Sequence, residues 1–303
     1  MLTRDPTDFF AFARTLPIRS EGVTAKAAFL VAPEQFQLAA QSASDNHYMD
    51  LDVVVDPQRA AAQHRGLQQT MSTTLPTICF PGDSTTPDAI FPNNVFATVP
   101  GTLILCHMRH PVRQAERARS DIRGFFRDTL GYAERDLGLQ PGICELTGSL
   151  VIDHARGIGY CGLSERCDAI GAQAMLDAFG LHAILAFDLA PGEYHTNVVL
   201  SVLAGRAVVL SPDGFADATV ADAIAGFYAP ATVRLTPIQK QAFAANCVAL
   251  SPSELFMSER AQCNLTDAQR DTLHNAGFQV RAVALDELEK AGGSLRCCVA
   301  ELY

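Results

Sequence analysis

Polar residues recur at a nearly constant interval along this chain, each at or just before the start of an apolar, strand-like run. They are Asn94, Glu145, His195, Asn246 and Cys297, and the successive intervals are 51, 50, 51 and 51 residues. A period near fifty residues indicates repeated supersecondary units, so one polar group per unit would meet the others around a pseudosymmetry axis. A thiol, an imidazole and a carboxylate are among them, which are the groups of a nucleophile, a proton carrier and an orienting residue. Because polar residues flank most strands, the interval needs support from the local sequences.

Composition narrows the class of protein and its partners. The 303 residues are 48% hydrophobic and 18% charged, which is typical of a compact globular protein, and the net charge of −10 argues against nucleic acid or an anionic membrane as a partner. The first thirty residues intersperse charges among short apolar pieces, so they predict neither a secretory signal nor a membrane span, and we expect a cytoplasmic protein. Nine scattered cysteines without a CxxC pair predict reduced thiols, and no cysteine and histidine set has zinc spacing, so we expect neither metal nor cofactor.

The pattern of apolar runs predicts repeated strand pairs, each followed by a helix. Residues 27–31 begin the series, residues 34–75 predict helix and loop with little legible chemistry, and 89–99 and 102–107 flank a Pro-Gly turn. Charged residues in 112–130 predict an amphipathic helix with a solvated face. Further strands are expected at 150–152, 158–163, 183–187, 196–203, 207–210, 233–235, 247–250, 254–257, 280–284 and 295–302, and helices at 168–179, 217–227 and 266–275. The sequence therefore predicts an α/β architecture with four or five repeats, in one domain at 26–303 after an N-terminal extension at 1–25.

Two segments carry the most specific chemistry. Cys297 ends Gly-Gly-Ser-Leu-Arg-Cys, in which glycines permit a sharp turn and close approach to a ligand, and Arg296 would favour the thiolate. His195 lies in Tyr-His-Thr-Asn, where a strand leaves a loop beside hydrogen-bonding side chains. A single cysteine is more often a small buried hydrophobe, and a single histidine is more often a surface or satisfied core residue. It is the pairing of the two, with Glu145 before another strand, that favours catalysis.

Together with Pro-Asp-Ala-Ile-Phe-Pro-Asn-Asn at 87–94 and the segment 239–246, these motifs resemble those of a known superfamily. It comprises the guanidino-group-modifying (pentein) enzymes: arginine deiminases, dimethylarginine dimethylaminohydrolases and amidinotransferases. Within it, the chain is most similar to the bacterial citrulline hydrolase branch, from about Phe29 to Tyr303. The resemblance implies a five-bladed α/β propeller with pseudo-fivefold repeats of strand pairs plus helix.

The resemblance also implies roles for individual residues. Cys297 would attack the ureido or guanidino carbon, and His195 would protonate the departing nitrogen and then activate water. Glu145 would orient His195 or hold a substrate nitrogen. Arg166 would bind the substrate carboxylate, although its sequence position is equally consistent with a surface ion pair. The remaining substrate-binding residues would be Asp88, which accepts hydrogen bonds from the planar head group, with Asn93, Asn94 and Asn246.

One departure from the family pattern bears on the substrate. Deiminases and dimethylarginine hydrolases have a carboxylate where Asn94 stands here, because a guanidinium cation needs anionic partners, whereas an amide suits a neutral ureido group. We therefore expect hydrolysis of citrulline or a derivative to an ornithine-type amine, ammonia and carbon dioxide. The alternatives are an arginine-derivative deiminase or dimethylargininase-like hydrolase and, in another class, a non-catalytic propeller that senses an amino acid or binds a partner. The sequence leaves the oligomeric state open, including a homo-oligomer.

Overall fold

Five sheets of the same topology make up the computed structural model, which describes all 303 residues. In each, two antiparallel strands are followed by a third strand parallel to the second. The sheets are β16 (Ala300–Leu302), β2 (Ala27–Val31) and β3 (Thr77–Phe80); β4 (Phe96–Val99), β5 (Thr102–Leu105) and β6 (Ala133–Asp136); β7 (Leu150–Asp153), β8 (Ile158–Leu163) and β9 (Ala183–Asp188); β10 (Leu200–Leu203), β11 (Ala207–Leu210) and β12 (Thr232–Arg234); and β13 (Val248–Ala249), β14 (Glu254–Ser258) and β15 (Gln279–Val283). The last strand of the chain thus completes the first sheet.

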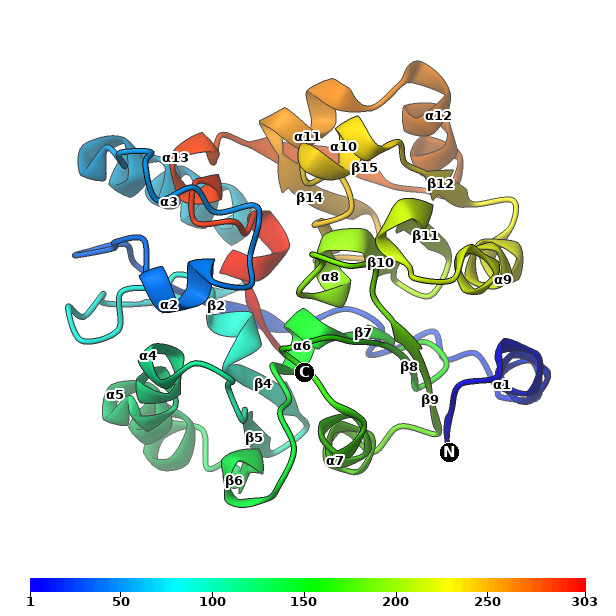
Figure 1. Cartoon of the computed structure of the whole chain (residues 1–303), viewed down its shortest axis with the longest axis horizontal. Helices are drawn as coiled ribbons and strands as arrows, with labels where there is room; N and C mark the ends of the chain where they lie inside the picture. Colours follow the sequence, from blue (N-terminus) through cyan, green and yellow to red (C-terminus); the bar gives the residue numbers. More distant parts are fainter.

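Helices connect the second strand of each sheet to the third, as a parallel pair requires. They lie around the outside of the molecule (Figure 1). Asp168 caps the third of these helices by accepting a hydrogen bond from the Gly171 backbone N–H at 2.7 Å, and Gly180 ends it with a φ of 62°. The connecting helices are α3 (Pro57–Ser72); α4 (Pro111–Gln114), η2 (Ala115–Ala118), α5 (Ser120–Gly124) and η3 (Phe125–Thr129); α7 (Ala169–Phe179); α9 (Ala218–Tyr228); and α11 (Glu259–Asn264) and α12 (Asp267–Asn275).

Short helical turns lead into four of the first strands and meet near the centre of the molecule. They are η1 (Pro92–Asn94), α6 (Leu146–Ser149), α8 (Thr196–Val199) and η6 (Leu295–Cys298). The turn α6 contacts both η1 and α8, and η1 contacts η6. The first strands also contact one another, β16 against β4 and β10 against both β7 and β13. The nearly constant interval therefore reflects a mixed α/β fold with a fivefold internal repeat (Figure 1).

Four expectations about secondary structure were wrong. The runs 196–203 and 295–302 begin with helical turns, and 89–99 is a strand only from Phe96, because a buried helical turn and a buried strand have the same apolar composition. The expected amphipathic helix at 112–130 is four short pieces, and Arg113 and Glu116 are buried in it as an ion pair rather than solvated. Strands β3 and β6 were not expected at all.

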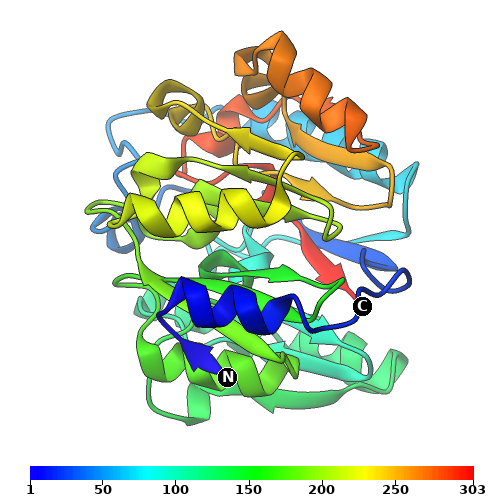
Figure 2. The ribbon, with the colours of Figure 1, turned by 90° about the vertical axis from the view of Figure 1, so that its right-hand side faces the viewer.

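The remaining short elements fill the loops between these units. They are β1 (Leu2–Thr3), α1 (Pro6–Ala13), α2 (Ala40–Ala43), η4 (Leu137–Leu139), η5 (Pro212–Gly214), α10 (Pro237–Gln241) and α13 (Asp286–Glu289). Strand β1 pairs in parallel with β9, and α1 buries Phe9 and Phe10 beside α9 (Figure 2). The first residues of the chain therefore pack on the third sheet.

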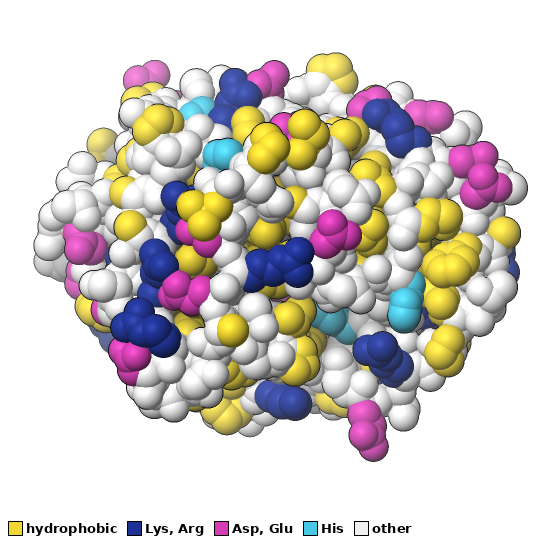
Figure 3. Space-filling view, turned by 90° about the horizontal axis from the view of Figure 1, so that it is seen from below, with side chains coloured by type: hydrophobic (Ala, Val, Ile, Leu, Met, Phe, Trp, Pro, Cys, Tyr) yellow, Lys and Arg dark blue, Asp and Glu magenta, His cyan; other side chains and the backbone are white.

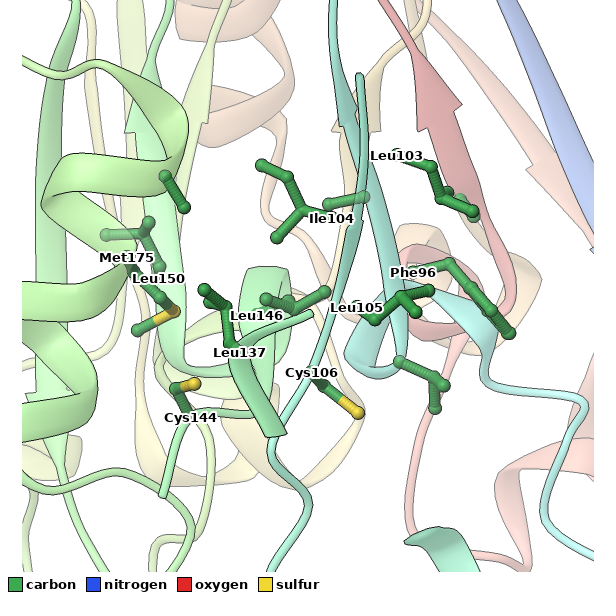
Figure 4. Close-up of a cluster of buried hydrophobic side chains, with 14 of the residues drawn as sticks. Phe96, Leu103, Ile104, Leu105, Cys106, Leu137, Cys144, Leu146, Leu150 and Met175 are labelled. Atoms are coloured by element: carbon green, nitrogen blue, oxygen red, sulfur yellow. The ribbon is translucent and has the colours of Figure 1, made fainter. Parts of the chain in front are cut away.

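Buried side chains between neighbouring sheets hold the central turns in place. Leu103, Ile104 and Leu105 of β5 are fully buried in a cluster that also contains Leu146 of α6 and Met175 of α7 (Figure 4). Burying one such side chain contributes about 1.5–3 kcal/mol. Apolar packing around Leu146 thus fixes the position of the turn α6, whose N-cap is Glu145.

Charges of both signs are interspersed on the surface face shown in Figure 3, with apolar atoms scattered between them. None of the helices has both the length and the apolar character that a bilayer span requires.

Candidate active site

The central turns enclose one small cavity, lined by five of the predicted site residues: Asp88, Asn94, Arg166, His195 and Cys297. Its free volume is about 20 Å³, roughly enough for one water molecule. Ser42, Asn46 and Met49, from the loop around α2, form part of its wall. The residues come from four of the five repeats and from this loop, so the fold gathers groups that lie far apart in the sequence.

Cys297 lies in η6 and lines this cavity, whereas the neighbouring Cys298 does not. The Asn246 Nδ2 donates to Cys297 Sγ at 3.3 Å, and the Cys297 backbone N–H donates to Asn246 Oδ1 at 3.4 Å. The thiol itself donates to Asn197 Oδ1 at 3.7 Å. Burial raises the pKa of the Cys297 thiol, while the Asn246 donor opposes that rise. Asn246 was predicted to bind substrate; here it does not line the cavity and instead contacts the sulfur.

His195 is fully buried and its two ring nitrogens differ. Its Nε2 donates to Glu145 Oε2 at 2.8 Å, while its Nδ1 has no hydrogen-bond partner. Burial lowers the pKa of His195, which favours the neutral imidazole, and the Glu145 hydrogen bond partly offsets this shift. The arrangement leaves Nδ1 free to exchange a proton with a bound molecule. There is no hydrogen bond between His195 and Cys297; the thiol's partners are both asparagines.

Glu145 is held as a carboxylate behind the imidazole. Burial alone would raise its pKa, but the charge of Arg166 and the His195 hydrogen bond lower the pKa well below its usual range. Arg166 Nη1 donates to Glu145 Oε2 at 3.2 Å, and the Arg109 backbone N–H donates to Oε1 at 3.2 Å. Glu145 does not line the cavity, so its position suits it to orient His195.

Two unpaired oxygens face the same region from the other side. Asp88 Oδ1 and Asn94 Oδ1 are buried without partners, while Asp88 Oδ2 accepts a hydrogen bond from Ser42 Oγ. Burial raises the pKa of Asp88, although the nearby Arg113 opposes this. Buried polar atoms without hydrogen-bond partners are rare, and each one indicates a position where a ligand or a water molecule can bind. Asn93 lies behind this wall, where its Nδ2 donates to Thr147 Oγ1 at 3.4 Å, and it does not line the cavity.

Gly148 permits the close approach of Asn94 to His195. A Cβ added at Gly148 would lie 2.5 Å from Asn94 Oδ1, 2.8 Å from His195 Cε1 and 2.9 Å from His195 Nδ1. Real Cβ atoms essentially never lie that close to a neighbour. Any side chain at this position therefore displaces the imidazole or the amide.

Several cavity residues were not predicted from the sequence. Arg113 is 3% exposed, donates from Nε and Nη2 to Glu116 at 2.6 and 2.9 Å and also contacts the Phe91 carbonyl at 3.1 Å. Its burial contradicts its charged local sequence, so no local pattern indicated it. Ser42 and Asn46, in the polar segment 34–75, were likewise missed because their partners, Asp88 and the Gly292 carbonyl, are far away in the sequence.

Comparison with known proteins places this chain in a family. The family model described as eukaryotic N,N dimethylarginine dimethylhydrolase matches residues 32–303. The chain belongs to this family. The resemblance to guanidino-group-modifying enzymes inferred from the motifs is thus confirmed.

Relatives of this dimethylarginine dimethylhydrolase family member include both uncharacterised and enzymatic proteins. The uncharacterised protein YkgA of Bacillus subtilis (strain 168) is 24% identical over 291 residues, 94% of each chain. The N-terminal domain of ArgZ, an arginine dihydrolase of the ornithine–ammonia cycle in cyanobacteria, superposes with a TM-score of 0.78 at 20% identity, over 91% of this chain and 97% of that one. DDAH from Pseudomonas aeruginosa, a mutant in complex with citrulline, gives 0.70 at 17% identity over 92% and 99%. At these identities the two structures establish the fold alone.

Proposed function

We propose that this chain is a cofactor-free thiol hydrolase that cleaves the ureido group of citrulline or a close derivative. Residues 26–303 form its catalytic domain, a closed five-bladed α/β propeller whose axis carries the site. Cys297 is the nucleophile, His195 the proton carrier and Glu145 the residue that orients it. The products are an ornithine-type amine, ammonia and carbon dioxide.

The observation that carries this proposal is the set of unpaired groups around the Cys297 thiol. His195 Nδ1, Asn94 Oδ1 and Asp88 Oδ1 all lack partners, and all three residues line the cavity with Cys297. Two acceptors and one exchangeable ring nitrogen fit a planar group that carries N–H donors next to an electrophilic carbon. A purely structural centre would have paired these atoms internally.

The reaction follows from these positions. Cys297 gives its thiol proton to His195 Nδ1 as Sγ attacks the ureido carbon, the carbon–nitrogen bond breaks, and the departing nitrogen takes that proton from His195. Water, deprotonated by the same imidazole, then cleaves the thiocarbamate and regenerates the thiol. The carbamate released decomposes to ammonia and carbon dioxide, so one citrulline and one water give one ornithine, one ammonia and one carbon dioxide.

Substrate entry requires movement of a segment that lines the site. The cavity holds about 20 Å³, far less than a citrulline side chain occupies. Ser42, Asn46 and Met49 form the part of the wall that comes from the loop around α2, and we expect this loop to open and admit the ligand. Closure then excludes water from the thio-intermediate until hydrolysis.

Asp88 supports a second candidate, hydrolysis of arginine or an arginine derivative at the same residues. Its carboxylate has one unpaired oxygen in the cavity, and a guanidinium cation is the head group that such an anion binds best. ArgZ, which shares the fold, is an arginine dihydrolase. Asn94, a neutral amide with an unpaired oxygen, favours the ureido group instead.

A panel assay of ammonia release tests the proposal. Citrulline, arginine, methylated arginines and their N-acyl forms are offered to the protein, with Cys297→Ser as the inactive control and Cys298→Ser as its matched neighbour. The proposal is supported if the protein releases ammonia from a ureido compound, the Cys298→Ser variant retains this activity and the Cys297→Ser variant loses it. Turnover of guanidines alone favours the second candidate, and binding without any turnover favours an amino-acid sensor.

A further inference from the structure

Asp45 lies directly after α2, on the loop that lines part of the cavity, and its carboxylate binds Arg166. Arg166 Nε donates to both Asp45 oxygens at 3.0 Å, and Nη2 donates to Oδ1 at 2.5 Å. Arg109 Nε and His110 Nε2 approach Asp45 Oδ2 at 3.4 and 3.0 Å. Burial opposes ionisation of Asp45, but the Arg166 guanidinium lowers its pKa below the usual value, so Asp45 is anionic at neutral pH.

Arg166 is consequently fully engaged within the protein. Its Nη1 donates to Glu145, its Nη2 also donates to the Ser42 carbonyl at 2.9 Å, and Asp45 covers its Nε side. The second arginine of the cavity wall, Arg113, is bound in the same forked manner by Glu116. Each guanidinium that lines the cavity is therefore already paired with a carboxylate of the protein itself.

We propose that Asp45 determines specificity by competing with a substrate carboxylate for Arg166. The inference rests on the proposed function, and it narrows the substrate class. A ureido compound with a free α-carboxylate must displace Asp45 from Arg166 or leave its own charge unpaired. A ureido compound without that carboxylate leaves the pair intact, and an ammonium group at its far end gains the Asp45 carboxylate as a partner.

Replacing Asp45 by asparagine removes the competing charge and keeps the shape of the side chain. A forked carboxylate–guanidinium contact is among the stronger hydrogen-bonded interactions. We therefore expect Asp45→Asn to raise kcat/KM for citrulline at least tenfold relative to N-carbamoyl-1,4-diaminobutane, which is citrulline without its carboxylate. A tenfold change in this ratio corresponds to about 1.4 kcal/mol.

The experiment compares these two substrates in steady-state assays, with binding to the Cys297→Ser protein measured by calorimetry. Asp50→Asn is the matched control, because Asp50 is exposed on the same loop and accepts only from the Asp52 backbone N–H. Asp45→Ala, which removes the competing group entirely, must shift the ratio in the same direction.

The outcomes separate this inference from the function on which it rests. A ratio that rises in both Asp45 variants and stays constant in Asp50→Asn supports the competition. Binding or turnover of both compounds with an unchanged or falling ratio overturns the competition and leaves the proposed function standing. If the parent protein neither binds nor turns over either compound, both the competition and the proposed function are overturned.

Discussion

We predict that replacing Asn94 with aspartate changes the head-group preference of the site. Asn94 is 2% exposed and its Oδ1 has no partner in the cavity, so a carboxylate there would be uncompensated beside a neutral ureido group. Leaving a buried charge unpaired costs about 3–5 kcal/mol. At about 1.4 kcal/mol for each factor of ten, kcat/KM for citrulline should fall by about two to three and a half decades. A guanidinium cation pairs with the same carboxylate, so turnover of arginine should rise.

The assay measures ammonia release from citrulline and arginine in parallel, together with the melting temperature of the variant. Asn275→Asp makes the same chemical change on an exposed residue of α12 and should alter neither substrate. Retained citrulline turnover with no gain on arginine would refute the reasoning, because Asn94 would then not contact the head group.

Three further results are expected. Iodoacetamide should modify Cys297 and not Cys298, because only Cys297 lines the cavity, and substrate should protect Cys297. Peptide mass spectrometry identifies the modified cysteine. Modification and substrate protection of Cys298 would contradict the prediction. Gly148→Ala should lower kcat/KM at least tenfold, because the new Cβ would lie 2.8 Å from His195 Cε1, whereas Gly226→Ala meets nothing within 4 Å and should leave kcat/KM unchanged. His195→Ala should cost about 10²–10⁴ in rate and abolish a bell-shaped kcat/KM profile. Burial raises the pKa of Cys297 and lowers that of His195, so alkylation of Cys297 should accelerate as the pH rises. Full turnover by His195→Ala would overturn the proposal that His195 acts together with Cys297.

The sequence predicted the repeat, and it also indicated candidate catalytic residues, because both leave a local signal. Strands β2, β8 and β11 lie at the expected residues, since each is an apolar run between turn residues. Cys297, His195 and Glu145 were found because they recur at the interval of the repeat. Whether the thiol and the imidazole act as proposed stays a prediction until the variants are assayed.

The charged groups behind the site left no such signal. Asp45 and Arg166 are 121 positions apart, and nothing near either residue in the sequence indicates the pairing. Arg113 stands in a segment whose charges predict a solvated helix, yet it is buried against Glu116. Burial and pairing of this kind follow from how the repeats close on each other, which a local pattern does not describe.

Under the proposed function, the candidate catalytic residues and the residues expected to select the tail of the substrate lie in different parts of this chain. The candidate catalytic residues lie on or beside short central turns, whose positions are set by the repeat and by the apolar packing around them. Part of the cavity wall comes instead from residues 32–56, between β2 and α3, a longer irregular segment than its counterparts after β5, β8, β11 and β14. It supplies Ser42 to Asp88, Asp45 to Arg166 and Asn46 to the Gly292 carbonyl. Because this segment is free of the repeat, its residues can change which tail is accepted while the thiol, imidazole and carboxylate stay in place.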